Sequence, residues 1–179
     1  MGTQGAGLNH KNLPGEPADH ALGRSRGGWS TKIHALTGEL CSPVTLLLSP
    51  GQAGDNPMLR PLIQAHREHH PTRFRLLADK AYSHPSTRAY LRAAKLAHTI
   101  PERSDQIAQR KAKGSRGGRP PSFDADAYRR RNTVERGFNR FKHWRGIATR
   151  YDKYALTYLG GVTLAAIVIH HRTHLPDTT

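Results

Sequence analysis

The stretch FDADAYRRRNTVERGFNRFKHWRG, residues 123–146, constrains the fold most, because its pattern predicts one long amphipathic helix. An aspartate at position 124 or 126 can cap its start, and Gly146 lies just past its predicted end. Four apolar side chains recur at roughly 100° per residue and share one side: Ala127, Val134, Phe138 and Phe141. This stripe should face a core.

A second line of residues on the same predicted helix consists of Tyr128, Arg131, Glu135 and Lys142, whose steps of three, four and seven place them on one face. Glu135 stands among many cations. In one interpretation these are ordinary ion pairs on a solvated helix, each worth ~0.2–0.5 kcal/mol. In the other, Glu135 binds a divalent metal while the cations hold a phosphate backbone, because magnesium takes carboxylate oxygen and shares its shell with substrate phosphate. The second interpretation predicts a phosphoryl-transfer site on nucleic acid.

The charge balance favours a polyanion as partner. Lys and Arg number 28 against 13 acidic residues, which gives a net charge of +15 and a pI near 10.8. The longest apolar run, residues 159–169, is too short to span a bilayer, and the first residues lack the apolar core of a signal peptide. A single cysteine, Cys41, excludes an internal disulfide and fits a reducing cytoplasm. We therefore expect a cytoplasmic nucleic-acid-binding domain with no membrane partner.

The first part of the chain predicts a flexible segment followed by a hairpin. Residues 1–28 are rich in Gly, Pro, Asn and His and show no periodicity, so we expect them to be flexible and a folded domain to occupy residues 29–175. Residues 30–36 alternate apolar and polar side chains as a half-buried strand does, and residues 43–48 form a more apolar run. The two runs predict a hairpin.

The next part places an acidic residue at the end of a buried strand. A helix is predicted from Pro57, capped by Asp55 or Asn56, and residues 74–78, FRLLA, predict a short strand that ends in Asp79. Open α/β sheets place ligand chemistry at the carboxyl ends of strands, although Asp79 can also simply cap the turn that follows. A helix over residues 85–94 and a strand over 97–100 come next.

Two further segments complete the chain. Residues 102–122 carry many cations among Gly, Ser and Pro and predict a flexible basic loop, which either follows a nucleic-acid backbone or is a solvated linker. A last helix is predicted over residues 154–171, with Leu159, Val162, Ala166 and Ile169 packed on the sheet. Gly160 and Gly161 permit the close approach of a neighbour.

This layout resembles the ribonuclease H-like domain of DDE transposases from bacterial insertion sequences. The segment LLADKAYS, residues 76–83, is similar to the block that carries the second aspartate of that family. Tyr128, Arg131, Glu135 and Lys142 fall at the spacing of its Tyr-Arg-Glu-Lys signature. The segments GRSRGGWSTKIHAL, LSPGQAGDNPML, GGRPPSF and WRGIATRYDKYA resemble the insertion-sequence-five type in particular. The resemblance covers about residues 21–173.

The resemblance implies an α/β fold with a ribonuclease H-like mixed sheet flanked by helices. It also implies three carboxylates that hold two Mg²⁺ (or Mn²⁺) ions, which cut a strand at the transposon end and join the freed 3′-hydroxyl to target DNA. By resemblance, Asp79 and Glu135 are catalytic metal ligands, and Tyr128, Arg131 and Lys142 position phosphate. The implied DNA contacts are Lys80, Arg129, Arg136, Trp144 and Arg145.

One part of the family pattern is missing. The first aspartate of the triad should lie on a strand before Ser30, yet residues 1–20 offer only Glu16 and Asp19, neither after an apolar run, and Asp55 comes too late. The helix-turn-helix region that reads transposon ends is not found either. Without the first, central strand, its two neighbouring strands should expose unpaired edges. We therefore expect the C-terminal catalytic part of a transposase, a truncated copy or the second product of a split reading frame, inactive alone.

Other functions fit part of the pattern. A non-catalytic DNA-binding remnant of a transposase keeps the charge and part of the fold, and a nuclease without strand transfer uses the same carboxylates. A basic ribosome-associated protein explains the charge but not the placement of Asp79 and Glu135. The partners expected for the leading hypothesis are the transposon ends and target DNA in the bacterial nucleoid, the upstream reading-frame product and a second copy of the chain. That hypothesis requires the carboxyl groups of Asp79 and Glu135 to converge.

Overall fold

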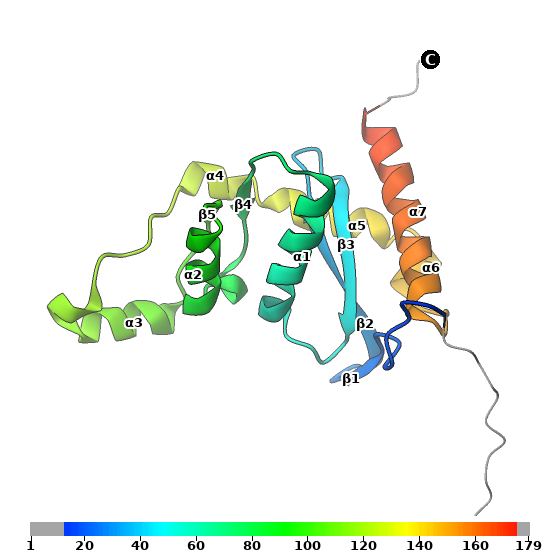
Figure 1. Cartoon of the computed structure of the whole chain (residues 1–179), viewed down its shortest axis with the longest axis horizontal. Helices are drawn as coiled ribbons and strands as arrows, with labels where there is room; N and C mark the ends of the chain where they lie inside the picture. Colours follow the sequence, from blue (N-terminus) through cyan, green and yellow to red (C-terminus); the bar gives the residue numbers. More distant parts are fainter. Residues whose placement is uncertain (1–12, 175–179) are drawn as a thin grey trace, which may run out of the picture.

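The computed structural model describes residues 13–174, which form a mixed α/β fold (Figure 1). Strands β1 (Gly23–Ser25), β2 (Gly28–Thr37) and β3 (Pro43–Pro50) form an antiparallel sheet in the order β1-β2-β3. Strands β4 (Arg75–Leu77) and β5 (Ala97–Thr99) form a separate parallel pair. The predicted α/β class is confirmed, and in the described part of the chain the strands form two small sheets instead of one continuous sheet.

The predicted hairpin is present as β2 and β3. Its register pairs Ile33 with Leu48 and Ala35 with Leu46, and the ladder shifts between Leu36 and Thr37. Because side chains alternate along a strand, Ile33, Leu46 and Leu48 lie on one face and pack against the apolar cluster of the C-terminal helices. The hairpin therefore supplies the apolar surface that the helices require.

A second core lies between the parallel strands and two helices, α1 (Asp55–His69) and α2 (Pro85–Ala93). Its fully buried members include Ile63, Leu91 and Ile100. The predicted cap of α1 was wrong: Gly54 is the N-cap residue, and Asp55 is the first helical residue. The carboxylate of Asp55 instead accepts a hydrogen bond from Lys32 Nζ at 2.9 Å.

The basic segment 102–122 differs from the predicted loop, because it contains α3 (Ser104–Ala112) and the short 3₁₀ helix η2 (Gly114–Gly117). The run SDQIAQRKA contains several good helix formers. The Arg103 N–H donates to the Gln106 side chain at 3.3 Å, and Arg110 pairs with Glu102 at 2.9 Å. The helix was not predicted because the Gly and Pro residues that flank it are typical of loops. In Figure 1 it lies at one end of the molecule, away from both sheets.

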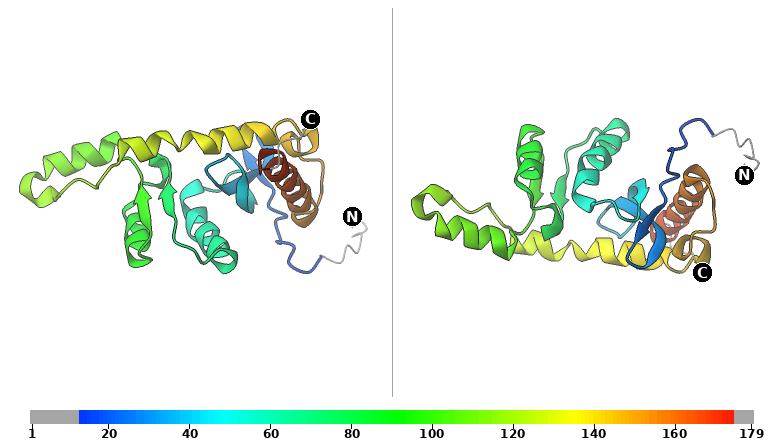
Figure 2. Two further views of the ribbon diagram at one scale, coloured as in Figure 1. Left: turned by 90° about the horizontal axis from the view of Figure 1, so that it is seen from above. Right: turned by 90° about the horizontal axis from the view of Figure 1, so that it is seen from below.

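The stretch 123–146 was predicted to be one helix, but the structure has three helices there: α4 (Ala125–Arg129), α5 (Asn132–Phe141) and α6 (Arg145–Ala148). Helices α4 and α5 follow one line along a side of the molecule (Figure 2). At the joint the hydrogen bonds tighten to a three-residue spacing, with the Val134 N–H donating to the Arg131 carbonyl at 3.0 Å. Gly146 lies inside α6, because Trp144 takes an extended backbone after α5 and starts a new turn.

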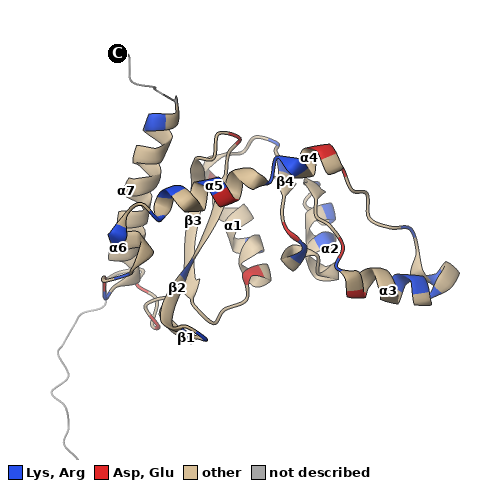
Figure 3. Ribbon diagram, turned by 180° about the vertical axis from the view of Figure 1, so that it is seen from behind, with Lys and Arg blue, Asp and Glu red and all other residues tan. Residues whose placement is uncertain are grey.

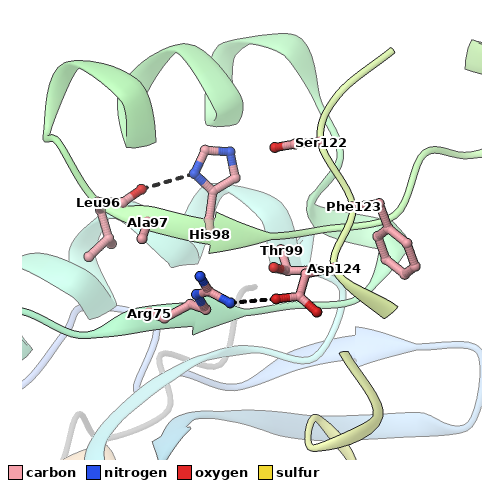
Figure 4. A pocket seen from close by; sticks show the side chains of 8 residues that line it. All are labelled: Arg75, Leu96, Ala97, His98, Thr99, Ser122, Phe123 and Asp124. Carbon is pink, nitrogen blue, oxygen red and sulfur yellow. Dashed lines mark hydrogen bonds and ion pairs between the residues drawn. The ribbon is translucent and has the colours of Figure 1, made fainter. Parts of the chain in front are cut away.

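The cavity in Figure 4 shows how α4 is held to β4. This cavity of about 450 Å³ lies between β5 and the chain that enters α4. Asp124 caps α4 by accepting the Ala127 N–H at 2.9 Å, and its other oxygen pairs with Arg75 of β4 at 2.7 Å. Asp126, the other predicted cap, pairs with Arg129 within the helix. The Asp124 pair therefore ties the strand before Asp79 to the helices that carry the signature.

The last helix, α7 (Ala155–His174), packs on the hairpin and on α5, and Glu16 holds its start. The two carboxylate oxygens of Glu16 accept the N–H groups of Ala155 and Leu156 at 2.7 and 2.9 Å. Residues 13–28 thus include a strand and a helix cap, while residues 1–12 of the predicted flexible segment lie outside the described residues. None of the helices in residues 13–174 has the length and hydrophobicity that crossing a bilayer requires.

Glu16→Gln tests this long-range cap through pH. Burial raises the pKa of Glu16, but hydrogen bonds from the Leu156 and Ala155 N–H groups and from His20 lower it overall from its ordinary value of 4.5. The carboxylate therefore stabilises the fold above that pH, and this stability is lost as pH falls through the lowered pKa. In thermal unfolding followed by circular dichroism, we expect Glu16→Gln to lower Tm by about 2–5 °C at neutral pH and to show a shallower acid dependence. Exposed Glu68→Gln is the control, and identical pH profiles for all three proteins would exclude the cap.

Asp124→Ala should lower Tm by about 2–4 °C, because it removes both the cap of α4 and the partner of Arg75. The matched change is Asp126→Ala two residues away, which removes only an exposed ion pair within one helix. We expect Asp126→Ala to leave Tm nearly unchanged. Equal losses from the two substitutions in a thermal-unfolding assay would show that the link from α4 to β4 adds nothing to stability.

Candidate active site

A cavity of about 300 Å³ lies where β2, α1, the end of β4 and α5 meet. Apolar side chains of all four elements line it, including Leu36, Leu59, Ala78 and Phe138. Its polar lining groups include two carboxylates and two cations: Asp55, Asp79, Lys32 and Arg131. The cavity therefore brings two carboxylates and two cations together at the boundary between the two sheets.

Asp79 lies at the carboxyl end of β4, as predicted from the apolar run before it. The pairing of the parallel strands continues to its neighbour, since the Ala78 N–H donates to the Thr99 carbonyl at 3.3 Å. Asp79 also caps the short helix η1 (Lys80–Tyr82) by accepting the Ala81 N–H at 2.8 Å. The simpler expectation of a turn cap and the placement at a cavity thus both hold for this residue.

Glu135 lies on α5 outside the lining of the cavity, and it contacts Arg131, which is part of that lining. The Arg131 guanidinium donates to Glu135 at 2.7 Å, with 26% of the Arg131 side chain and 58% of the Glu135 side chain exposed. Burial lowers the pKa of Arg131, but the hydrogen bond to Glu135 and nearby negative charges, that of Asp79 among them, raise it overall. One guanidinium therefore lies within the influence of both predicted metal ligands.

The signature residues cross the joint between α4 and α5. Tyr128 is on α4, and its ring centroid lies 5.5 Å from the Arg131 guanidinium carbon. Arg131 is the N-cap residue of α5 and contacts both Tyr128 and Glu135, so the structure brings these three side chains together. Lys142 follows the end of α5, where its ammonium group donates to the Asn139 side chain at 3.3 Å.

The residues predicted to contact DNA have different surroundings. Lys80 and Arg136 are exposed, and Arg129 pairs with Asp126. Arg145 donates to the Tyr151 hydroxyl at 3.2 Å. Trp144 is half-buried against the apolar cluster around α7, so part of its ring stabilises the fold. Figure 3 shows basic segments recurring along α4, α5 and α6 and again on α3.

The carboxylates of residues 13–174 do not form a complete divalent metal site. Within residues 13–174 no three His, Cys, Asp or Glu side chains are grouped so that they could hold a metal ion. Asp55 is paired with Lys32, and Asp19 caps a turn by accepting the Ala21 N–H at 2.9 Å. Asp79 and Glu135 both lie near Arg131, and their expected role as metal ligands stays a prediction.

The sequence analysis missed Lys32 and Tyr82 at this cavity. Lys32 also donates to the Ala53 carbonyl at 2.7 Å, which fixes its ammonium group beside Asp55. Burial, together with the charges of Asp55 and Asp79, raises the pKa of Tyr82 to about 12. The alternation of residues 30–36 marks Lys32 as polar, but no sequence signal identifies a partner 23 positions away.

Comparison with known proteins identifies the family. The profile of the family described as "Transposase DDE domain" matches residues 10–169. A Brucella ovis protein named "Putative transposase for insertion sequence element IS6501" is 30% identical over 142 residues, which cover 78% of this chain and 97% of that protein. No solved structure matches the chain. The family profile spans Asp79, the cavity and the whole signature, so the chain belongs to the transposase DDE domain family and has a role in DNA transposition.

Proposed function

We propose that this chain supplies two of three carboxylates to a centre that cleaves DNA strands and transfers them in a metal-dependent reaction. Family membership and the common relation of Asp79 and Glu135 to Arg131 support this proposal. Bound Mg²⁺ or Mn²⁺ would stabilise the attacking and leaving oxygens of an in-line phosphoryl transfer. Because no three possible ligand side chains are grouped within residues 13–174, we assign the third carboxylate to a further segment.

The observation that carries the proposal is the gap between the two sheets. Strand β1 pairs only with residues 28–30, so beyond Ser30 the β2 edge opposite β3 has no strand partner among residues 13–174. Within the same residues, β4 has a partner on one edge alone. The cavity between them is lined by residues 32–36 of β2 and by Ala78 and Asp79 after β4. One extended segment placed there would satisfy both edges and join the sheets into a ribonuclease H-like mixed sheet.

That segment is expected to carry a carboxylate near the Asp79 end of the cavity. Lys32 and Arg131 line the cavity but already pair with Asp55 and Glu135, so bound metal ions would be what offsets the added negative charge. The upstream product of a split reading frame is the proposed source. In this proposal the chain is the C-terminal catalytic part of a transposase of the insertion-sequence-five type, and the added segment is its central strand.

The roles of the other signature residues follow from their contacts. The Arg131 guanidinium, held by Glu135 and the Tyr128 ring, presents further N–H groups that suit a phosphate. Lys142 provides a second cation at the end of α5. We propose that these residues position the DNA backbone and take no direct part in the chemical step. A non-catalytic DNA-binding remnant is the second candidate, because three carboxylates are not gathered within residues 13–174.

A complementation assay tests the catalytic proposal. The chain is mixed with the polypeptide encoded upstream of it, Mg²⁺ and DNA that carries the flanking end sequence, and nicks are read on a denaturing gel. We expect nicking by the mixture and none by the chain alone. Asp79→Asn and Glu135→Gln should each reduce nicking about 100-fold or more, since single electrostatic groups in active sites contribute 10²–10³, whereas Glu68→Gln should not. A mixture that binds this DNA without nicking it would support the remnant.

DNA affinity tests the proposed contacts of Arg129 and Arg136, which differ in one respect. Arg129 already pairs with Asp126, whereas no acidic side chain in the described part of the chain pairs with Arg136. We expect Arg136→Gln to weaken binding to a labelled duplex several-fold and to reduce the log–log salt slope by about 1. Arg129→Gln should have a smaller effect on both. Fluorescence anisotropy over a salt series measures the affinity and the salt slope. Unchanged slopes in both variants would show that Arg129 of α4 and Arg136 of α5 do not contact DNA.

A further inference from the structure

The hairpin of β1 and β2 carries the most exposed large apolar side chain in residues 13–174. Trp29 is 75% exposed, ahead of Leu164 at 66% and Tyr151 at 63%. In Figure 1 this hairpin lies at the lower edge of the molecule. A single exposed apolar residue needs no explanation by itself, so the surroundings of Trp29 decide what its ring can bind.

Hydrogen bonds hold the tip of this hairpin in one conformation. The strand ladder pairs Ser25 with Gly28, which has a φ of +106° that glycine adopts without strain. The Ser25 hydroxyl donates to the Gly28 carbonyl at 3.0 Å, and the Ser30 hydroxyl donates to the Ser25 hydroxyl at 3.1 Å. Trp29 lies between Gly28 and Ser30, so an ordered element presents its ring to solvent.

Two cations accompany the indole ring. Arg24 lies directly opposite Trp29 in the ladder, so the two side chains leave the sheet on the same side. Arg26 follows at the turn. Both arginines are exposed, neither forms an ion pair within residues 13–174, and no Asp or Glu occurs from residue 20 to residue 38. An exposed ring beside unpaired cations suits single-stranded nucleic acid, whose bases stack on aromatic rings while its phosphates contact the cations.

Strand β2 connects this hairpin to the candidate active site. Trp29, Thr31 and Ile33 alternate onto one face of the strand. Ile33 packs against the apolar cluster of α5 and α7, and Thr31 accepts a hydrogen bond from Arg150 at 2.5 Å. Trp29 thus lies on the face that carries the signature helix α5. Lys32 of the cavity lining is about 10 Å from Trp29 along the strand, a length of about three base steps of B-DNA.

We propose that Trp29 is the binding site for an unpaired DNA base, which stacks on the indole while Arg24 and Arg26 contact the phosphates beside it. The base is unpaired because, inside a duplex, both faces of each base are already covered by its neighbours. This inference rests on the proposed function, since a nick frees a strand end whose last bases can leave the duplex. The hairpin then holds the freed end close to the cavity.

Oligonucleotide binding by the full chain tests this site. Labelled oligo-dT and a duplex of the same length are compared by fluorescence anisotropy without Mg²⁺. Trp29→Ala should weaken binding of the single strand at least about fivefold and binding of the duplex less than about twofold, because only the single strand offers a free base face. Trp29→Phe should keep most of the single-strand affinity, since a phenyl ring also stacks.

The cations and a control are tested in the same assay. Arg24→Gln and Arg26→Gln should each lower the log–log salt slope for the single strand by about 0.7. Leu40→Ala is the matched control, because Leu40 is 50% exposed in the turn between β2 and β3, and this variant should bind both DNAs like the wild type. Circular dichroism of each variant checks that it is folded.

Tryptophan fluorescence gives a second measurement. The chain has two tryptophans, and a base stacked on Trp29 should quench the emission when oligo-dT is added. This quenching should be lost in Trp29→Phe, which keeps Trp144 and still binds. Quenching that persists in Trp29→Phe overturns the proposal, as does an unchanged single-strand affinity or an equal loss of single-strand and duplex affinity in Trp29→Ala. These assays need neither Mg²⁺ nor the upstream polypeptide, so the stacking site and the nicking reaction fail separately.

Discussion

The fold depends on how α4 and α5 pack across the two sheets. Within residues 13–174 no strand of one sheet is hydrogen-bonded to a strand of the other. At one end the Asp124–Arg75 pair fixes α4 to β4. At the other, α5 crosses the hairpin at Gly137, where an added Cβ would lie 3.1 Å from the Cys41 carbonyl oxygen and 3.3 Å from the Thr37 methyl group. A larger residue at 137 would lift the helix from the hairpin. The position of Arg131 and Glu135 relative to Asp79 is set by these two anchors.

The electrostatics of the cavity explain why carboxylates persist in so basic a chain. Lys32 is held beside Asp55, and Arg131 is held beside Glu135 with Asp79 near enough to affect its pKa. Each carboxylate is therefore stabilised by a cation that the fold positions, and none relies on the diffuse surplus of positive charge. Asp55 and Glu135 thus offset the charges of Lys32 and Arg131, so a further carboxylate or phosphate at this cavity would need bound cations as well.

The sequence predicted what depends on local pattern. Alternation identified the β2–β3 hairpin, an apolar run placed Asp79 at the end of β4, and helical periodicity identified the faces of α5 and α7. The failures have tertiary causes. The joint at Arg131 precedes Asn132 and Thr133, which are weak helix formers, but the helical periodicity of the apolar residues runs through it, so the pattern alone predicted one helix. The cap of α7 by Glu16 spans 139 positions, and no local signal predicts it. The site prediction named Asp79 and Glu135, whose catalytic role stays a prediction, and it did not include Lys32, because the contact of Lys32 with Asp55 joins residues 23 positions apart.

The two uncovered regions of the molecule differ in chemistry, and this difference indicates different partners. At the β2 edge of the hairpin the open groups are backbone N–H and C=O groups beside cations, which an extended acidic segment satisfies. At the β3 edge the lining combines aliphatic side chains, such as Val44 and Leu46, with the imidazoles of four histidines: His69, His70, His170 and His171. A segment added at the β2 edge would leave the β3 edge uncovered. Because α1 lines both cavities, a segment bound at the β2 edge would also stabilise the helix that borders the cavity at the β3 edge.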